Sequence, residues 1–149
     1  MKLVVQCVLN ASVSIENRIV SSIDRGYLVF VSFTDGDNSE TIIKMVHKLV
    51  SLRIFPDENG KTNLSIKDIN GSILSVSQFT LYASVIHGNR PSFTNCLKYD
   101  EASKLYDFFN EELKKSEVPY ETGEFGADMK INLINDGPFT LILDSKEFN

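Results

Sequence analysis

Histidine is scarce in this chain of 149 residues, and that scarcity limits the chemistry to be expected of it. Only His47 and His87 are present; the first falls within a helical pattern and the second within a predicted loop. No HxH, HExxH or mixed Cys/His cluster occurs, so a metal site is not expected. A Ser/His/Asp triad would need His87 to lie near Ser77 or Thr80; no GxSxG motif supports it, but the sequence leaves it open.

Cysteine pairs, long apolar runs and excess positive charge are lacking as well. Cys7 and Cys96 are far apart and form no CxxC motif, which favours free thiols in a reducing compartment over a disulfide. No apolar run approaches the roughly 20 residues that a membrane span requires, and the run at residues 3–5 is too short for a signal peptide. We therefore expect a cytoplasmic protein without a membrane partner. The net charge of −5 predicts no DNA partner, and any RNA would have to meet a local basic patch.

The chain does contain alternating strand-like and helix-like patterns, without repeats or a linker, which fits a single domain over residues 1–149. Apolar residues at helical spacing predict amphipathic helices over residues 39–52 and 101–115, and Asp37 with Glu40 predicts a capping box. Strands are predicted over residues 3–9, 12–15, 18–23, 27–33, 72–79, 120–124, 129–134 and 139–143. Hairpin turns are predicted at 16–17 and 70–71. This mixture predicts an α/β or α+β fold with helices packed on a curved sheet.

Two polar interruptions between apolar runs are the strongest indication of a binding site. Residues 77–80 read Ser-Gln-Phe-Thr and offer hydroxyls, an amide and backbone N–H groups. Gly137-Pro138 stands at a strand entrance, where a cis peptide bond could direct two carbonyl groups into a cleft. Simpler interpretations stay open, because strand-end hydroxyls often bind local backbone and Gly-Pro can be a trans turn. Asp136 can likewise cap its own turn, and residues 125–129 can pack without a ligand.

Several linked motifs, taken together, resemble the D-aminoacyl-tRNA deacylase family over nearly the whole chain. In the family's order they are Ala11-Ser12-Val13, Leu52-Arg53-Ile54-Phe55, Asn59-Gly60-Lys61, Asn63-Leu64-Ser65, Ser77-Gln78-Phe79-Thr80-Leu81-Tyr82-Ala83, Arg90-Pro91-Ser92-Phe93, Glu121-Thr122-Gly123, Phe125-Gly126-Ala127-Asp128-Met129 and Asn135-Asp136-Gly137-Pro138. Linked motifs of this length are far more specific than any one of them.

The resemblance implies a homodimeric hydrolase of mixed α/β fold, with a curved sheet forming a partial barrel and two main helices. Such an enzyme needs no cofactor and cleaves the ester joining a D-amino acid to the 3′-terminal adenosine of tRNA. It also acts on glycine mischarged on the tRNA for alanine. In the family, a cis Gly-Pro bond enters the partner subunit's site, where its carbonyl groups exclude the L-side chain. Gly137 and Pro138 would form that selectivity filter.

The resemblance also implies roles at the strand end. The candidate catalytic residues are Ser77, Gln78, Phe79 and Thr80. The backbone N–H groups of Phe79 and Thr80 would form an oxyanion hole, and Phe125 and Met129 would hold the terminal adenine. Thr80 could be a nucleophile, but no base to activate it is evident. The family is read instead as substrate-assisted, with the RNA 2′-hydroxyl helping water to attack.

Four residues depart from the family's pattern. Cys7 stands where an arginine that braces the Gly-Pro loop is expected, and Phe139 replaces a smaller apolar residue. Asn89 replaces a basic residue, and Thr62 stands where methionine is common. These departures bear on rejection of L-substrates more than on the reaction. The candidate basic residues for tRNA are Arg53, Lys61, Lys67 and Arg90.

Two other functions remain open to test. One is a nucleic-acid-binding or interaction module that shares the scaffold without catalysis. The other is a general esterase that uses Thr80 or Ser77 with His87.

Overall fold

The computed structural model describes residues 1–148, and within them the chain forms eight strands, two α-helices and two short 3-10 turns. In chain order these are β1 (Lys2–Ile15), β2 (Arg18–Ile23), β3 (Gly26–Ser32), α1 (Ser39–Val50), β4 (Arg53–Pro56), β5 (Thr62–Ser65), β6 (Ser72–Ser77), η1 (Phe79–Tyr82), α2 (Tyr99–Lys115), β7 (Tyr120–Thr122), β8 (Lys130–Asp144) and η2 (Ser145–Glu147).

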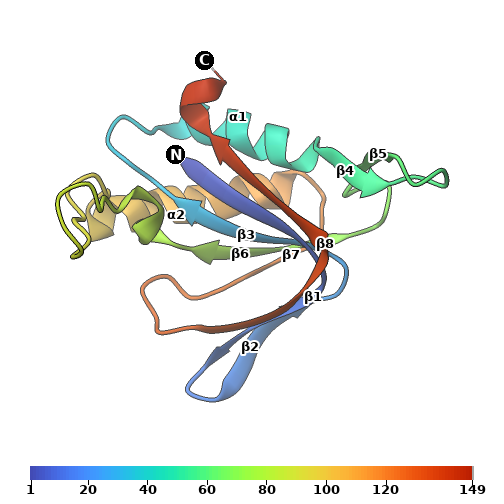
Figure 1. Cartoon of the computed structure of the whole chain (residues 1–149), viewed down its shortest axis with the longest axis horizontal. Helices are drawn as coiled ribbons and strands as arrows, with labels where there is room; N and C mark the ends of the chain where they lie inside the picture. The colour runs from blue at the N-terminus through green and yellow to red at the C-terminus, as the bar shows by residue number, and fades with distance from the viewer. Residues whose placement is uncertain (149) are drawn as a thin grey trace.

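β1 is the centre of a curved, mixed sheet. On one edge its first half pairs antiparallel with β3 and its second half with β2, while its other edge pairs with β8 along almost the whole strand. β6 runs parallel to β3, and β7 parallel to β6. The end made of β2 and the neighbouring parts of β1 and β8 bends away from the helices (Figure 1), which confirms the expected mixed α/β fold with a curved sheet.

β1 contributes to two separate apolar cores, and a bulge after Val8 keeps its second half in the second core. Leu3 and Val5 belong to the core beneath the helices, whereas Val8 and Ala11 belong to a second core inside the bend. The register with β8 is irregular between Val8 and Asn10, and an extra residue there reverses which face the following side chains occupy. The sequence predicted two strands separated at this point; the structure has one strand with a bulge.

Both α-helices pack on one face of the sheet (Figure 1) because each has one apolar stripe. The buried residues of α1 are Ile42, Met45, Val46 and Leu49, and those of α2 are Ala102, Tyr106, Phe109 and Leu113. Burial of a side chain such as Phe109 contributes roughly 1.5–3 kcal/mol. Truncating it to alanine would cost about 3–5 kcal/mol, because a cavity would remain.

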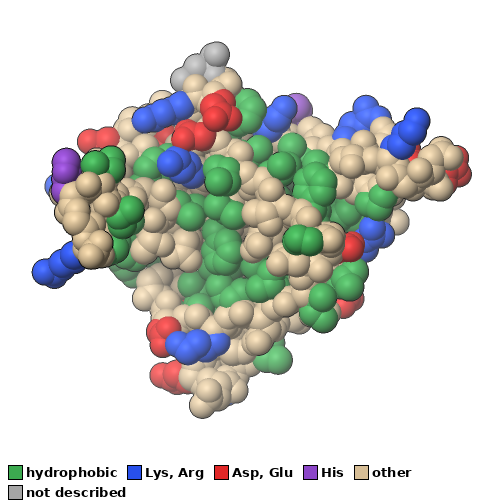
Figure 2. Space-filling view, viewed as in Figure 1, with side chains coloured by type: hydrophobic (Ala, Val, Ile, Leu, Met, Phe, Trp, Pro, Cys, Tyr) green, Lys and Arg blue, Asp and Glu red, His purple; other side chains and the backbone are tan. Residues whose placement is uncertain are grey.

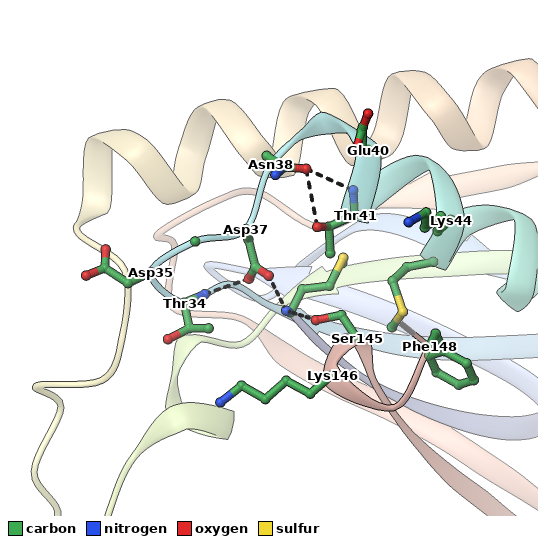
Figure 3. Close-up of a pocket in the computed structure, with 13 residues that line it drawn as sticks. Thr34, Asp35, Asp37, Asn38, Glu40, Thr41, Lys44, Ser145, Lys146 and Phe148 are labelled. Carbon is green, nitrogen blue, oxygen red and sulfur yellow. Dashed lines mark hydrogen bonds and ion pairs between the residues drawn. The ribbon is translucent and has the colours of Figure 1, made fainter.

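The start of α1 differs from the expected capping box. Asn38 is the N-cap, and its side chain accepts a hydrogen bond from the Thr41 N–H at 3.1 Å. Asp37 instead accepts from the Thr34 N–H at 2.8 Å and pairs with the amino group of Met1. That amino group also donates to Ser145 Oγ at 2.6 Å (Figure 3), beside a cavity of about 330 Å³. These bonds tie the first strand, the loop before α1 and η2 together.

The structure also corrects other predicted strand boundaries, because these depend on which strands pair. The strand predicted over residues 72–79 ends at Ser77, and Phe79 lies in η1. Asn70-Gly71 is a turn but does not join a hairpin, because β5 pairs with β4 and β6 pairs with β3 and β7. The strands predicted over residues 129–134 and 139–143 are the two ends of β8. In the described part of the chain, no helix is long and apolar enough to cross a membrane.

Candidate functional site

The end of β6 forms one wall of a cavity of about 690 Å³, to which Ser77, Gln78 and Phe79 contribute. β6 lies between two parallel neighbours, and its pairing continues one residue further because the Gln78 N–H donates to the Val31 carbonyl at 2.8 Å. The chain then leaves the sheet and turns into η1. The carboxyl ends of parallel strands are where open α/β sheets bind ligands.

Thr80 lies next to this cavity without lining it. Thr80 is exposed, and its Oγ1 accepts a hydrogen bond from Gln78 Nε2 at 2.6 Å. Among the described residues this is the one side-chain hydrogen bond of that hydroxyl, and an amide cannot act as a general base. The geometry therefore gives no support to Thr80 as an activated nucleophile.

The opposite walls of the cavity come from two segments distant in sequence. Phe93 and Cys96 lie in the segment leading into α2 and Tyr99 is its first residue, while Phe125 and Met129 lie between β7 and β8. The Tyr99 and Phe125 rings meet edge to face, with centroids 5.1 Å apart. Aromatic faces and a polarizable thioether suit a flat ring such as a nucleobase. The structure thus brings two predicted adenine-binding residues into one cavity with residues 77–79.

Gly137 and Pro138 do not line this cavity. They are exposed in the Gly-Pro loop (residues 136–139), a bulge of β8 that interrupts its pairing with β1 opposite Cys7, since Gln6 faces Thr140 and Val8 faces Asn135. Ser77, at the end of β6, pairs with Val31 of β3, which pairs with Leu3 of β1. Leu3 lies four residues before Cys7, which is opposite the loop of β8. The loop therefore lies four residues along the strands and three strands across from the end of β6. At the usual spacings this is about 13 Å along the strands and about 14 Å across them.

The peptide bond between Gly137 and Pro138 is cis, as the resemblance implies, and Gly137 has a φ of +130°. A Cβ at Gly137 would come within 2.9 Å of the Phe139 nitrogen. Glycine is therefore required there on two counts, because L-residues rarely adopt that φ and the neighbouring backbone leaves no room.

The residues that contact the Gly-Pro loop differ from the arginine that the family's pattern places at position 7. Cys7 is buried beneath the loop, and burial, with the charge of Asp136, raises the pKa of its thiol to about 11. Arg25 Nε lies 3.8 Å from Asp136 Oδ2, and the Arg25 guanidinium lies over the Phe55 ring at 5.4 Å. The Cys7 thiol is neutral at physiological pH, and Arg25, in the turn just before β3, supplies a cation beside the loop.

Two further residues contact the site through the carbonyl group of Phe79. Ser32 Oγ donates to this oxygen at 3.2 Å and Cys96 Sγ at 3.3 Å. Neither residue was predicted from the sequence; the one available signal was a serine at the end of an apolar strand. His47 and His87 do not line the cavity. Within residues 1–148 no cluster of three or more His, Cys, Asp or Glu side chains could hold a metal ion.

Comparison with known proteins places these features in a family. The family model described as D-Tyr-tRNA(Tyr) deacylase matches residues 4–144. A D-aminoacyl-tRNA deacylase of Lactobacillus gasseri is 51% identical over 144 residues, which cover 97% of this chain and 99% of the relative. This chain belongs to the D-aminoacyl-tRNA deacylase family. It is accordingly a hydrolase, and a tRNA substrate is implied for this deacylase.

Solved structures agree with the fold of this deacylase. One, described as a "c-Myc DNA Unwinding Element Binding Protein", has a TM-score of 0.92 and 39% identity, covering 97% of this chain and 98% of its own. Another, described as a probable eukaryotic D-amino acid tRNA deacylase, has a TM-score of 0.82 and 19% identity, covering 95% and 97%. At that identity the second likeness concerns the fold alone.

Proposed function

We propose that this deacylase hydrolyses the ester between a D-amino acid and the 3′-terminal adenosine of tRNA in a site shared by two protomers. The cavity of one protomer would be completed by the Gly-Pro loop of the other. The observation that carries this proposal is the separation of the two parts within one chain. The cavity holds residues 77–79 together with Phe125 and Met129, whereas Gly137 and Pro138 lie exposed in the opposite corner of the sheet.

An apolar row on the sheet face opposite the helices supports dimerisation. Val4 pairs with Ile142 on one side and with Phe30 on the other, so these three side chains lie in line across neighbouring strands. Ile142 is 67% exposed, and Val4 and Phe30 are partly exposed. Figure 2 shows hydrophobic side chains gathered over the strands in the middle of the view. A continuous apolar surface of this kind marks an interaction site, and a second copy is the occupant that also supplies the loop.

In the proposed reaction, Phe125 and Met129 hold the terminal adenine and water attacks the ester carbonyl carbon. The N–H groups of Phe79 and Thr80 stabilise the developing oxyanion, an effect worth roughly 10²–10³ in rate per donor. The bond from the carbonyl carbon to the 3′-oxygen then breaks, the 3′-oxygen takes the proton that the attacking water gives up, and the free amino acid leaves. The neighbouring 2′-hydroxyl of the RNA orients the water, so no side-chain base is required.

Main-chain groups would distinguish D-amino acids from L-amino acids. The carbonyl groups of the Gly-Pro loop would occupy the space that an L-side chain needs and leave a D-side chain free. Because these carbonyls belong to the backbone, every L-side chain is rejected alike. Glycine has no side chain to reject, so glycine mischarged on the tRNA for alanine is hydrolysed as well. We also expect the protein to act in the cytoplasm, where mischarged tRNA arises.

The first test is a comparison of D-tyrosyl-tRNA, L-tyrosyl-tRNA and glycyl-tRNA with purified protein. We expect fast loss of the D-ester and the glycyl ester while the L-ester is spared. Equal loss of the D- and L-esters would contradict the proposed filter. Loss of an activated simple ester that disappears in His87→Ala would favour a general esterase instead.

A heterodimer test separates a shared site from a site within one chain. One protomer carries Gly137→Ala, which disturbs the loop, and the other carries Ala127→Trp, which fills the cavity that Ala127 lines. If the loop acts across subunits, the one working cavity receives an intact loop and the heterodimer spares L-tyrosyl-tRNA. If the loop acts within its own chain, the heterodimer hydrolyses the L-ester. Each homodimer serves as a control: Gly137→Ala should lose discrimination, and Ala127→Trp should be inactive.

DNA binding is a second candidate, because one related structure is described as a DNA unwinding element binding protein. The net charge of −5 favours weak, non-specific binding at most. In the same protein preparation, we expect little retention of duplex DNA or uncharged tRNA in a filter-binding assay at two salt concentrations. Strong binding that falls steeply with salt would favour the nucleic-acid-binding module.

A further inference from the structure

We propose that Ser32 and Cys96 are positioning residues that orient the Phe79–Thr80 peptide for the deacylation step. The inference rests on the proposed function, because it concerns the Thr80 N–H as an oxyanion donor. It assigns a role to two side chains that are far apart in sequence and meet at one backbone oxygen.

The carbonyl oxygen of Phe79 is held from two directions. Ser32 is the last residue of β3, is 1% exposed, and donates through Oγ at 3.2 Å. Cys96 lines the cavity and donates through Sγ at 3.3 Å. The Cys96 N–H donates to the Phe93 carbonyl at 3.0 Å, which fixes the backbone from which the thiol extends. A buried serine hydroxyl directed at this oxygen leaves the peptide little freedom to rotate.

Peptide geometry transfers this constraint to the N–H group. The 79–80 peptide is trans, so the Thr80 N–H points opposite to the Phe79 carbonyl. Phe79 and Thr80 are also the first residues of η1, and the first N–H groups of a helical turn have no acceptor within it. Anchoring the oxygen therefore also fixes the direction of this N–H, which has no acceptor within η1. The two hydrogen bonds also polarise the peptide and strengthen its N–H as a donor.

The Cys96 thiol is suited to this role because it remains a donor. Burial raises its pKa above the ordinary value of 9.0, so at neutral pH the sulfur carries its proton. A thiolate could only accept a hydrogen bond and would repel the Phe79 carbonyl oxygen. Small displacements matter here, since a misplacement of about 1 Å in an active site can lower the rate roughly 10²-fold.

The test measures kcat and KM for D-tyrosyl-tRNA in Ser32→Ala, Cys96→Ala and Cys96→Ser. Losing one neutral hydrogen bond should lower kcat about five-fold in each alanine variant, with KM unchanged, because the donor acts on the transition state. Cys96→Ser keeps a donor and should stay within about two-fold of the parent. The amide chemical shift of Thr80, measured by NMR, should move in both alanine variants and return towards the parent value in Cys96→Ser.

Thr34→Val is the matched control. Thr34 Oγ1 donates to the Asn95 carbonyl at 2.8 Å, so this change loosens the same segment beside Cys96 without touching Phe79. We expect its kcat and its Thr80 shift to match those of the parent. Unchanged kcat in both alanine variants, or an equal loss in Thr34→Val, would overturn the positioning role. The proposed function would survive that result as long as the D-ester is still cleaved and the L-ester spared.

Discussion

At the scale of single residues, the two cysteines differ in what surrounds their thiols. Cys7 is 3% exposed under the Gly-Pro loop and close to Asp136, and both burial and that carboxylate disfavour the thiolate. Cys96 faces the cavity and donates to a backbone carbonyl. The sequence predicted free thiols at both positions, and the structure contains both as free cysteines. The surroundings of the two thiols depend on strand pairing and on loop placement, and neither can be predicted from the spacing of the cysteines in the sequence.

Stability should depend on pH through Cys7. Its pKa is raised from 9.0 to about 11, so between these values the folded protein keeps a proton that the unfolded chain releases. The contribution is therefore complete below pH 9 and is lost as pH rises towards 11, by about 2 to 3 kcal/mol. Urea unfolding at several pH values should show this decline in the parent and a smaller decline in Cys7→Val. An equal decline in both proteins would contradict the assignment.

At the scale of elements, the two helices and most strands could be predicted because their apolar residues follow regular periods. The loop within β8 could not be placed, since its partners Cys7 and Arg25 come from β1 and from the turn before β3. The exit of the chain from β6 after Ser77 was also missed, because apolar Phe79 continues the strand pattern while its backbone turns into η1. The candidate site residues were predicted from the resemblance, and the strand register was needed to separate the loop from the cavity.

Arg25 should support discrimination through the Gly-Pro loop. Its pair with Asp136 has side chains 45% and 37% exposed, so its effect on stability is small. We expect Arg25→Gln to raise hydrolysis of L-tyrosyl-tRNA relative to D-tyrosyl-tRNA, because the loop loses a lateral contact. Arg25→Lys should keep most of the discrimination.

A double-mutant cycle with Asp136→Asn checks this pairing. If the two side chains act together, the double variant should discriminate no worse than either single variant. Independent, multiplying losses would indicate that Arg25 acts through Phe55 or another contact instead.

At the scale of the whole molecule, one face of the sheet carries the helices and the other carries the apolar row of Val4, Phe30 and Ile142. The sequence could not indicate this division, because β1 has partly buried residues on both faces and its neighbours are known only from the register. The proposed dimer would cover the row and bring a second Gly-Pro loop to each cavity. A substitution that prevents dimerisation should therefore also abolish deacylation.

Ile142→Glu should give monomers, because a carboxylate in a buried apolar interface is strongly disfavoured. Light scattering after size-exclusion chromatography measures the mass, and the same fractions are assayed with D-tyrosyl-tRNA, for which we expect at least a roughly 10²-fold loss of activity. Ile43→Glu is the control, since Ile43 is 48% exposed on α1, on the far side of the sheet. A fully active Ile142→Glu monomer would rule out a shared site.

The pairing of β1 with β8 also has a consequence for synthesis. β1 ends at Ile15 and β8 begins at Lys130, so at about 5–20 residues per second the ribosome adds β8 roughly 6 to 23 s after β1. Throughout that interval the nascent chain presents a long strand with an unpaired edge, which is a template for association with other chains. Early release by a stop codon before residue 130 leaves that edge open permanently. Truncated products should therefore aggregate, even though every residue of the cavity wall at β6 has already been made.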